Sequence, residues 1–238
     1  MRSLMRRLAR RFRSAPDFLA RRGELAAHWL RGDGLEIGAL HAPVPLPPGA
    51  RARYVDRLPV EQLRAHYPEL AARPLVSVDV IDDGERLASI PDASQDFVVA
   101  CHFLEHAQDP IGVIATQLRV LKPGSALFLA VPDRRRTFDR RRPPTSWEHA
   151  VRDHRDGPAA SYEEHLREWA ELVCGFTGAA AEACAAQVRD TGYSIHFHAW
   201  DPTELAEFLA RATALVGGAR VAACEDAGDE VLAVIERP

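Results

Sequence analysis

Lysine is nearly absent from this chain of 238 residues. Of its 30 Lys and Arg residues only Lys122 is a lysine, and the other 29 are arginines. They are outnumbered by 34 acidic residues, so the formal net charge is −4 and whole-chain charge does not favour nucleic-acid binding. No apolar run approaches the roughly 20 residues that cross a bilayer, which excludes a transmembrane bundle.

Paired cysteines are also missing. Cys101, Cys174, Cys184 and Cys224 contain no CxxC pair, so a zinc ribbon or a thioredoxin-type site lacks its basic spacing. We expect reduced, buried thiols in a cytoplasmic protein. The basic N-terminus develops no apolar h-region, and a signal peptide is therefore not expected.

What the chain does have is a basic, helical beginning. In residues 1–13, apolar side chains recur at helical spacing and arginines fill the other face. Such a helix can contact an anionic membrane surface or nucleic acid, or it can be a solvated helix at the domain edge. Helical character continues over 17–31. We treat 1–33 as an N-terminal basic extension.

From residue 34 apolar strands alternate with helices. The expected strands are 34–38, 52–57, 74–81, 96–101 and 125–131, with helices at 59–70 and 109–121. Nearly continuous apolar strands separated by helices indicate a parallel sheet covered on both faces. Residues 34–133 would form the cofactor-binding half.

The regular alternation of strands and helices ends after Val131. Residues 134–192 are rich in Arg and Pro and then helical, so we predict a helical insertion after the fifth strand that acts as a substrate lid. A helix follows at 202–215, started by Asp201 and Pro202. Two short-linked strands, 219–224 and 229–236, must pair antiparallel and complete the sheet within 193–238. The predicted fold is α/β: a Rossmann-like, doubly wound, mainly parallel seven-stranded sheet with an antiparallel C-terminal hairpin.

Acidic residues follow the first three predicted strands. Ligands of open parallel sheets bind beyond the carboxyl ends of the strands. Carboxylates there can accept hydrogen bonds from ribose hydroxyls or an adenine amino group. A phosphate cradle would need glycines and cations, but the first loop offers only Gly38. The pattern therefore favours a nucleoside ligand without phosphates over NAD or ATP.

The stretches LEIG, YVD, DFVVACHFLEH and RVLKPGS resemble those of class I S-adenosylmethionine-dependent methyltransferases over residues 34–133. The segments DRRRTFDRRRP and IHFHAW resemble a bacterial subfamily. The family's usual GxGxG is reduced here to Gly38, with Ala39 and His41 in the later positions. The resemblance implies S-adenosylmethionine as cofactor and S-adenosylhomocysteine as product. By resemblance, Glu36, Gly38 and Ala39 would contact the methionine and ribose part of the cofactor, and Asp56 would contact the ribose hydroxyls. Asp82 or Asp83 would bind the adenine, and His102 would lie beside the sulfonium.

His102, Glu105 and His106 follow the fourth strand and are the candidate catalytic residues. A histidine here can act as general base toward an acceptor hydroxyl or amine, and His106 is the first candidate. Packing or helix orientation is the alternative for both histidines. Glu105 would cap a helix or hold a neighbouring histidine.

Histidine pairs at His149/His154 and His196/His198 raise the question of a metal. His196 and His198 would share one strand face, which suits two imidazole ligands. Spacing alone is weak support, so we expect no metal. We assign His149, His196, His198 and Trp200 to the wall and floor of the acceptor pocket instead.

Six arginines crowd into residues 134–142. Guanidinium groups suit carboxylates and phosphates, so Arg136 and Arg140 are candidate contacts for an anionic or phosphate-bearing acceptor. Internal pairing with acidic residues is the alternative.

The sequence predicts a methyltransferase acting on a small-molecule or glycan acceptor, first of all on oxygen. The rivals are a cofactor-binding or partner protein without catalysis, and a metal-dependent enzyme that uses the histidines. Nucleic acid is not an expected partner. Peripheral membrane contact would involve residues 1–13.

Overall fold

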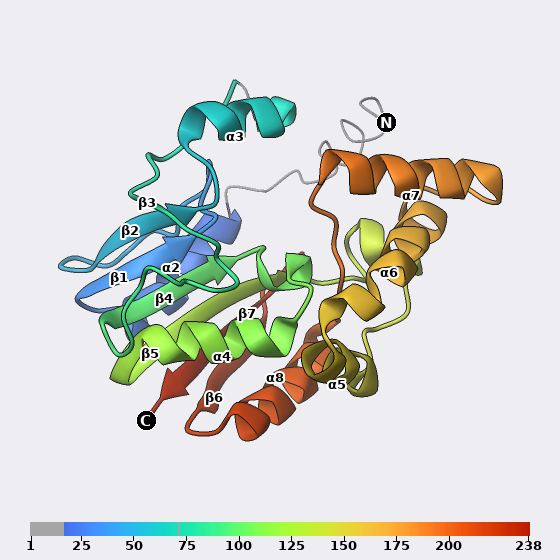
Figure 1. Ribbon diagram of the computed structural model, residues 1–238. Helices are drawn as coiled ribbons and strands as arrows, with labels where there is room; N and C mark the ends of the chain where they lie inside the picture. The colour runs from blue at the N-terminus through green and yellow to red at the C-terminus, as the bar shows by residue number, and fades with distance from the viewer. Residues whose placement is uncertain (1–16, 71) are drawn as a thin grey trace.

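Seven strands form one sheet in the order β3-β2-β1-β4-β5-β7-β6 (Figure 1). The computed structural model describes residues 17–70 and 72–238, so the predicted helix at 1–13 lies outside the described residues. The strands are β1 (Asp33–Ile37), β2 (Arg51–Asp56), β3 (Val80–Ile81), β4 (Gln95–Cys101), β5 (Leu121–Pro132), β6 (Arg220–Asp226) and β7 (Glu230–Arg237). β1 to β5 pair in parallel, and β7 runs antiparallel to both β5 and β6. The predicted fold class is confirmed.

Helices alternate with the strands and then form the insertion. They are α2 (Asp17–Trp29), α3 (Val60–His66), α4 (Pro110–Val120), α5 (Trp147–Asp156), α6 (Tyr162–Glu168), α7 (Ala179–Thr191) and α8 (Pro202–Val216). α8 starts where expected: Asp201 and Glu204 form a reciprocal capping box, and Pro202 occupies the first turn. No helix in the described ranges is long and apolar enough to cross a bilayer.

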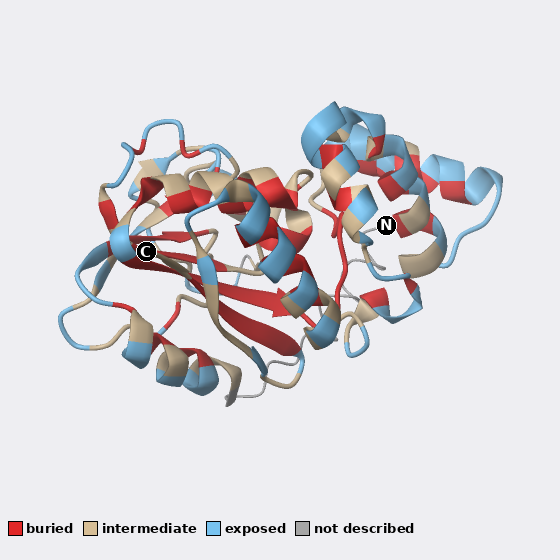
Figure 2. Ribbon diagram, turned by 90° about the horizontal axis from the view of Figure 1, so that it is seen from below, coloured by how far each residue is buried: buried red, intermediate tan, exposed pale blue. Residues whose placement is uncertain are grey.

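Alternate residues of the central strands enter two different cores. Val98, Ala100, Leu127 and Leu129 pack with α4 and α8 on one face. Phe97, Val99, Phe128 and Ala130 pack with α2 on the other face. Because side chains alternate between the two faces of a strand, both faces of β4 and β5 lie in apolar surroundings. Figure 2 shows these strands as the buried centre of the molecule.

The third predicted strand, 74–81, is the main departure. Only its last two residues form β3. Upstream, the N–H of Val76 donates to the carbonyl of Leu40 instead of extending the ladder. The Asp79 carboxylate accepts from the backbone N–H of Tyr54 at 2.8 Å, so a side chain takes a donor that a longer strand would use. This side-chain hydrogen bond ends the backbone pairing between β2 and β3 at this edge of the sheet.

In the structure the insertion takes up the whole segment between β5 and α8, residues 133–201, and it has a small core of its own. Leu166, Trp169, Val188, Ile195 and Phe197 pack together around α6, α7 and the π-helix η5 (Trp169–Val173). Its two ends meet where Asp133 bridges Trp200, at the carboxyl end of β5. Figure 1 shows α5, α6 and α7 gathered beside the sheet, beyond this bridge.

Candidate active site

The carboxyl ends of β1, β2 and β4 carry the residues that the sequence assigned to the cofactor. Gly38 turns the chain after β1 with φ +65°, a conformation that glycine adopts at no steric cost. A Cβ on Gly38 would have only the Phe103 ring within 4 Å, whereas one on Gly84 would clash with Ile37 and Phe103 at under 3 Å. Gly84 therefore admits the Phe103 ring against the end of β1. Ala39 is half-buried in the same turn.

Glu36 is buried beneath this turn. Its Oε1 accepts from the N–H of Val44 at 2.9 Å, and its Oε2 has no hydrogen-bond partner in the described residues. Burial raises the pKa of Glu36 to about 7, against the opposing effects of the Val44 bond and the Arg22 charge. An unmatched carboxylate oxygen at this position can serve a polar group of a bound ligand.

The raised pKa makes Glu36 a source of pH-dependent stability. Because its folded-state pKa lies above the unfolded value of 4.5, its contribution is complete below that value and is lost as pH rises through about 7. The loss amounts to up to about 3 kcal/mol of the free energy of unfolding. We expect Glu36→Gln, which keeps the acceptor for Val44, to flatten the decline between pH 5 and 8 in urea titrations. Parallel wild-type and variant curves would contradict this.

Asp56 is the last residue of β2, and Asp82 and Asp83 follow β3. Burial raises the pKa of Asp56, while the N–H groups of Arg57 and Leu58 bond to it and oppose the rise. Asp82 accepts from the backbone N–H and the hydroxyl of Ser89, at 2.8 and 2.6 Å. Asp83 is exposed. The three carboxylates thus lie along the edge where the sequence placed them, and their cofactor contacts stay predictions.

His102 is the best-oriented histidine of the site. Its ring Nε2 lies 2.9 Å from Glu230 Oε2, and its Nδ1 lies 3.5 Å from Glu105 Oε1. Arg22 in turn donates to both Glu230 oxygens, at 2.9 and 2.6 Å. Burial alone would raise the pKa of Glu230, but the bonds from His102 and Arg22 lower it to about 2. An ionised carboxylate, itself held by Arg22, therefore orients a ring that is partly exposed.

Glu105 and His106 lie in the short turn η2 (Leu104–His106). His196, from the 194–200 segment, packs beside both of them. Glu105 Oε1 is 4.0 Å from His106 Nε2 and 3.9 Å from His196 Nε2. Burial raises the pKa of Glu105. Burial, reinforced by His196, lowers the pKa of His106 to about 3, which makes it a weak base near neutrality. The pKa of His106 and the contacts of His102 favour His102 over His106 for proton removal, and the catalytic roles of His102, Glu105 and His106 stay predictions.

The insertion is anchored to this site by a buried ionic network. His196 Nδ1 lies 2.6 Å from Asp139 Oδ2, and Arg142 Nη1 donates to Asp139 at 3.0 Å. Arg142 also donates to Glu168 and to the carbonyls of His196 and Phe197. One arginine therefore links η3 (Phe138–Arg141), α6 and the 194–200 segment.

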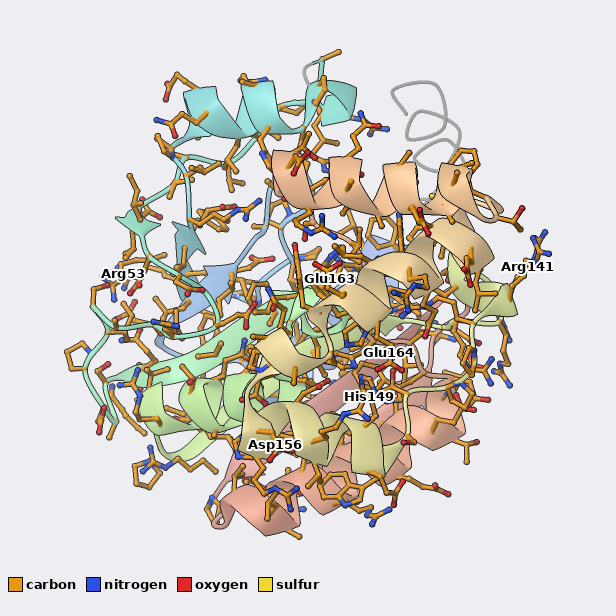
Figure 3. All side chains as sticks on the ribbon, turned by 45° about the vertical axis from the view of Figure 1, so that its right-hand side comes forward. Arg53, Arg141, His149, Asp156, Glu163 and Glu164 are labelled. Atoms are coloured by element: carbon orange, nitrogen blue, oxygen red, sulfur yellow. The ribbon has the colours of Figure 1, made fainter. Side chains whose placement is uncertain are left out.

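Most of the arginine cluster is paired within the chain. Arg134 makes a two-bond pair with Glu204, Arg135 pairs with Asp133, and Arg136 contacts Asp133 and Asp226 at 3.4 and 3.3 Å. Arg140 is exposed, and Arg141 points outward at the edge of the insertion in Figure 3. The anion-binding role of Arg136 and Arg140 stays a prediction, which now rests mainly on Arg140.

Three residues assigned to the acceptor are enclosed by protein or contact other side chains of the insertion. His198 and Trp200 are at most 1% exposed, and their rings stack on each other. His149 lies on α5 opposite α6, near Glu164 (Figure 3), and its Nε2 is 3.1 Å from His165 Nε2. This geometry does not favour direct acceptor contact by these three, and their role stays a prediction.

Sequence reasoning missed several residues of the site. Arg22 and Glu230 are 208 positions apart, and no local pattern marks them as partners. Asp139, Asp153 and His165 were passed over because they stand inside polar segments. The one available signal was the spacing of His149 and Asp153, which puts both on one helix face.

The comparisons with known proteins identify the class. Residues 8–212 match the model of a family described as a methyltransferase domain, and the chain belongs to that family. It is 34% identical over 88 residues to a ubiquinone biosynthesis O-methyltransferase of Xanthomonas oryzae pv. oryzae, covering 36% of each chain. The chain thus matches about a third of the length of this curated relative.

Solved structures share the fold. The chain superimposes on a putative methyltransferase from a complex with the Haloferax volcanii Trm112 methyltransferase activator (TM-score 0.52, 16% identity, 93% of this chain and 89% of that one). A putative S-adenosyl-L-methionine-dependent methyltransferase of Methanococcus maripaludis gives a TM-score of 0.50 at 12% identity, covering 99% and 91%. The protein is therefore a methyltransferase with the Rossmann-like fold, and this fold implies S-adenosylmethionine as cofactor.

Proposed function

We propose that this methyltransferase methylates an oxygen atom of a small-molecule acceptor. The arrangement of His102, Glu230 and Arg22 at the carboxyl ends of the strands carries the proposal. A hydroxyl becomes a competent nucleophile when a positioned base takes its proton, and an imidazole oriented by a carboxylate is suited to that task.

The residues at the sheet edge fit the cofactor. Asp56 offers a carboxylate after β2, where hydroxyls of a ribose are bound in such sheets. Gly38 keeps the turn after β1 open, and beneath it Glu36 has an oxygen without a hydrogen-bond partner in the part of the chain that the structure describes. Glu36, Gly38, Ala39, Asp56 and Asp82 or Asp83 would hold the cofactor. When bound, S-adenosylmethionine supplies an electrophilic methyl group.

Proton removal is the task of His102. Because Nε2 donates to the Glu230 carboxylate, Nδ1 is the ring nitrogen that accepts the acceptor proton. The positive charge that forms on the ring then lies between Glu230 and Glu105. Arg22 keeps Glu230 in place. Such proton transfer contributes about 10²–10⁴-fold, and alignment of the reactants supplies the larger part.

The acceptor class rests on two supports. The curated relative is named an O-methyltransferase of ubiquinone biosynthesis, although the match covers about a third of its length. Arg140 is an exposed cation in the segment that leaves β5, which favours an acceptor with a carboxylate or phosphate.

Calorimetry and methyl transfer test this function. We expect S-adenosylhomocysteine to bind the chain, and Asp56→Ala to weaken binding by about tenfold or more, as loss of a charge-assisted bond predicts. Labelled S-adenosylmethionine would then be offered with phenols and sugar alcohols, each with and without a carboxylate or phosphate. Binding without transfer to any hydroxyl would support a cofactor-binding protein without catalysis. Absence of binding would refute the proposal.

A metal-assisted reaction is the second candidate. Both Glu105 oxygens are buried and find no hydrogen-bond partner among the described residues, and Glu105, His106 and His196 place ligand atoms within 4.8 Å of one another. Asp139 behind His196 resembles the carboxylates that orient metal-bound imidazoles. Turnover that needs an added divalent ion, and loses that need in His196→Gln, would favour this candidate.

A further inference from the structure

A second histidine cluster lies inside the insertion, separate from His102. It consists of His149 and Asp153 on α5, His165 on α6 and His198 in the segment before α8. Asp153 and His198 are fully buried, His165 is 4% exposed, and the side chain of His149 is 19% exposed. One ligand atom from each of the four residues lies within 4.8 Å of the others.

The spacing is close to that of a tetrahedral site. Asp153 Oδ2 is 3.1, 3.7 and 3.9 Å from Nε2 of His149, His165 and His198. The Nε2 atoms of His149 and His165 are 3.1 Å apart. Four ligands at about 2.0–2.1 Å from a zinc ion stand about 3.3–3.4 Å from each other. The four separations above lie on both sides of this value, and all the ligand atoms stay within 4.8 Å of one another, so small movements of these side chains would let them enclose one ion.

Two of these atoms are otherwise unsatisfied. Asp153 Oδ2 and His198 Nε2 are buried and form no hydrogen bond of normal geometry with the described residues. Three imidazoles face this one carboxylate oxygen, at 3.1, 3.7 and 3.9 Å, and a cation among them would give all of the buried ligand atoms a partner at once. Ser161 donates to the other oxygen, Asp153 Oδ1, and fixes the orientation of the carboxylate.

We propose that His149, Asp153, His165 and His198 form a closed structural zinc site that joins α5, α6 and the 194–200 segment. Three imidazoles and one carboxylate suit zinc, and four protein ligands leave no position for substrate. When Nε2 of His149 binds the ion, its Nδ1 carries the proton. Arg152, now 2.8 Å from that Nδ1, then turns toward Glu164, which it already contacts at 3.2 Å.

The zinc site would stabilise the insertion next to the active site. The backbone N–H groups of Phe197 and His198 both donate to the carbonyl of Glu105, at 2.7 and 3.1 Å. A ligand of the proposed ion is thus bonded directly to the turn that carries the candidate catalytic residues. The site itself does not depend on methyl transfer, so its test is independent of the proposed function.

Metal content of the full chain, purified without a histidine tag, tests the site. We expect about one zinc per chain by elemental analysis after dialysis against zinc. His149→Gln and His165→Gln should weaken zinc binding by about 100-fold or more, since each removes one of four ligands. His154→Gln, on the same helix but outside the cluster, should keep the metal. Removal of zinc by a chelator should lower the Tm of the wild-type chain but not that of His165→Gln.

Three results would overturn the proposal: no zinc in the wild-type chain, full zinc in both ligand variants, or zinc lost only in His196→Gln. The third would place the ion in the Glu105 cluster. Because His149 is the least buried ligand, circular dichroism and S-adenosylhomocysteine binding of His149→Gln show whether loss of metal occurs in a folded chain. Uptake of cobalt instead of zinc gives visible absorption bands that report a four-coordinate site.

Discussion

His102→Gly should lower kcat/KM by about 10²–10⁴-fold with any hydroxyl acceptor that the wild-type chain methylates, because it removes the proposed base. Glycine is the substitution of choice since His102 has φ +51°, which glycine tolerates without strain. It also leaves room for a free imidazole. Steady-state methyl transfer with and without added imidazole measures the effect, and imidazole should restore part of the rate.

His106→Gln is the matched control for His102→Gly. It changes the other half-buried histidine of the same turn, whose pKa is lowered to about 3. We expect a loss of less than about tenfold, since such a weak base contributes little at neutral pH. A large loss in His106→Gln with little change in His102→Gly would assign the base to His106, as the sequence first suggested.

Arg142→Met should reduce the free energy of unfolding by about 3–5 kcal/mol, because it leaves buried charge without a partner. Arg142 is 3% exposed and donates to Asp139, Glu168 and two backbone carbonyls. Methionine fills similar space but donates no hydrogen bond. Urea unfolding followed by fluorescence measures the loss.

Arg141→Met serves as the control for that substitution. Arg141 is the adjacent arginine, is exposed, and points away from the insertion (Figure 3). Its replacement should change stability by no more than about 0.5 kcal/mol. Equal effects at both positions would show that the network around Arg142 is not what holds η3 to α6.

The sheet could be predicted from the sequence because its signals are local. Runs such as 96–101 and 125–131 are apolar throughout, and a strand buried on both faces needs no other information to be recognised. The strand expected at 74–81 failed because Asp79 uses its side chain to bond the neighbouring strand. The strand propensity of a segment does not reveal that a carboxylate will take the place of a backbone carbonyl as hydrogen-bond acceptor.

Positions in the candidate site could be predicted only from the rule that ligands bind at the carboxyl ends of parallel strands. Asp56 and His102 follow strands, so the rule for parallel sheets placed them at one edge. Glu230 begins the last strand and Arg22 lies on the first described helix, and their pairing with His102 depends on the completed sheet. The arginine cluster shows where density alone is ambiguous: Arg134 and Arg142 pair with acidic residues of the chain itself, while the anion-binding role of Arg136 and Arg140 stays a prediction.

The position of β7 between β5 and β6 has a consequence for how the chain assembles. β5 forms no ladder on its outer side until residues 230–237 have been synthesised and enter the sheet. Glu230 arrives with that strand, so Arg22 and His102 acquire their shared partner in the same event. Pairing over such separations is slow relative to helix formation. We therefore expect the nascent chain to remain inactive until β7 docks, because only then does Glu230 orient His102.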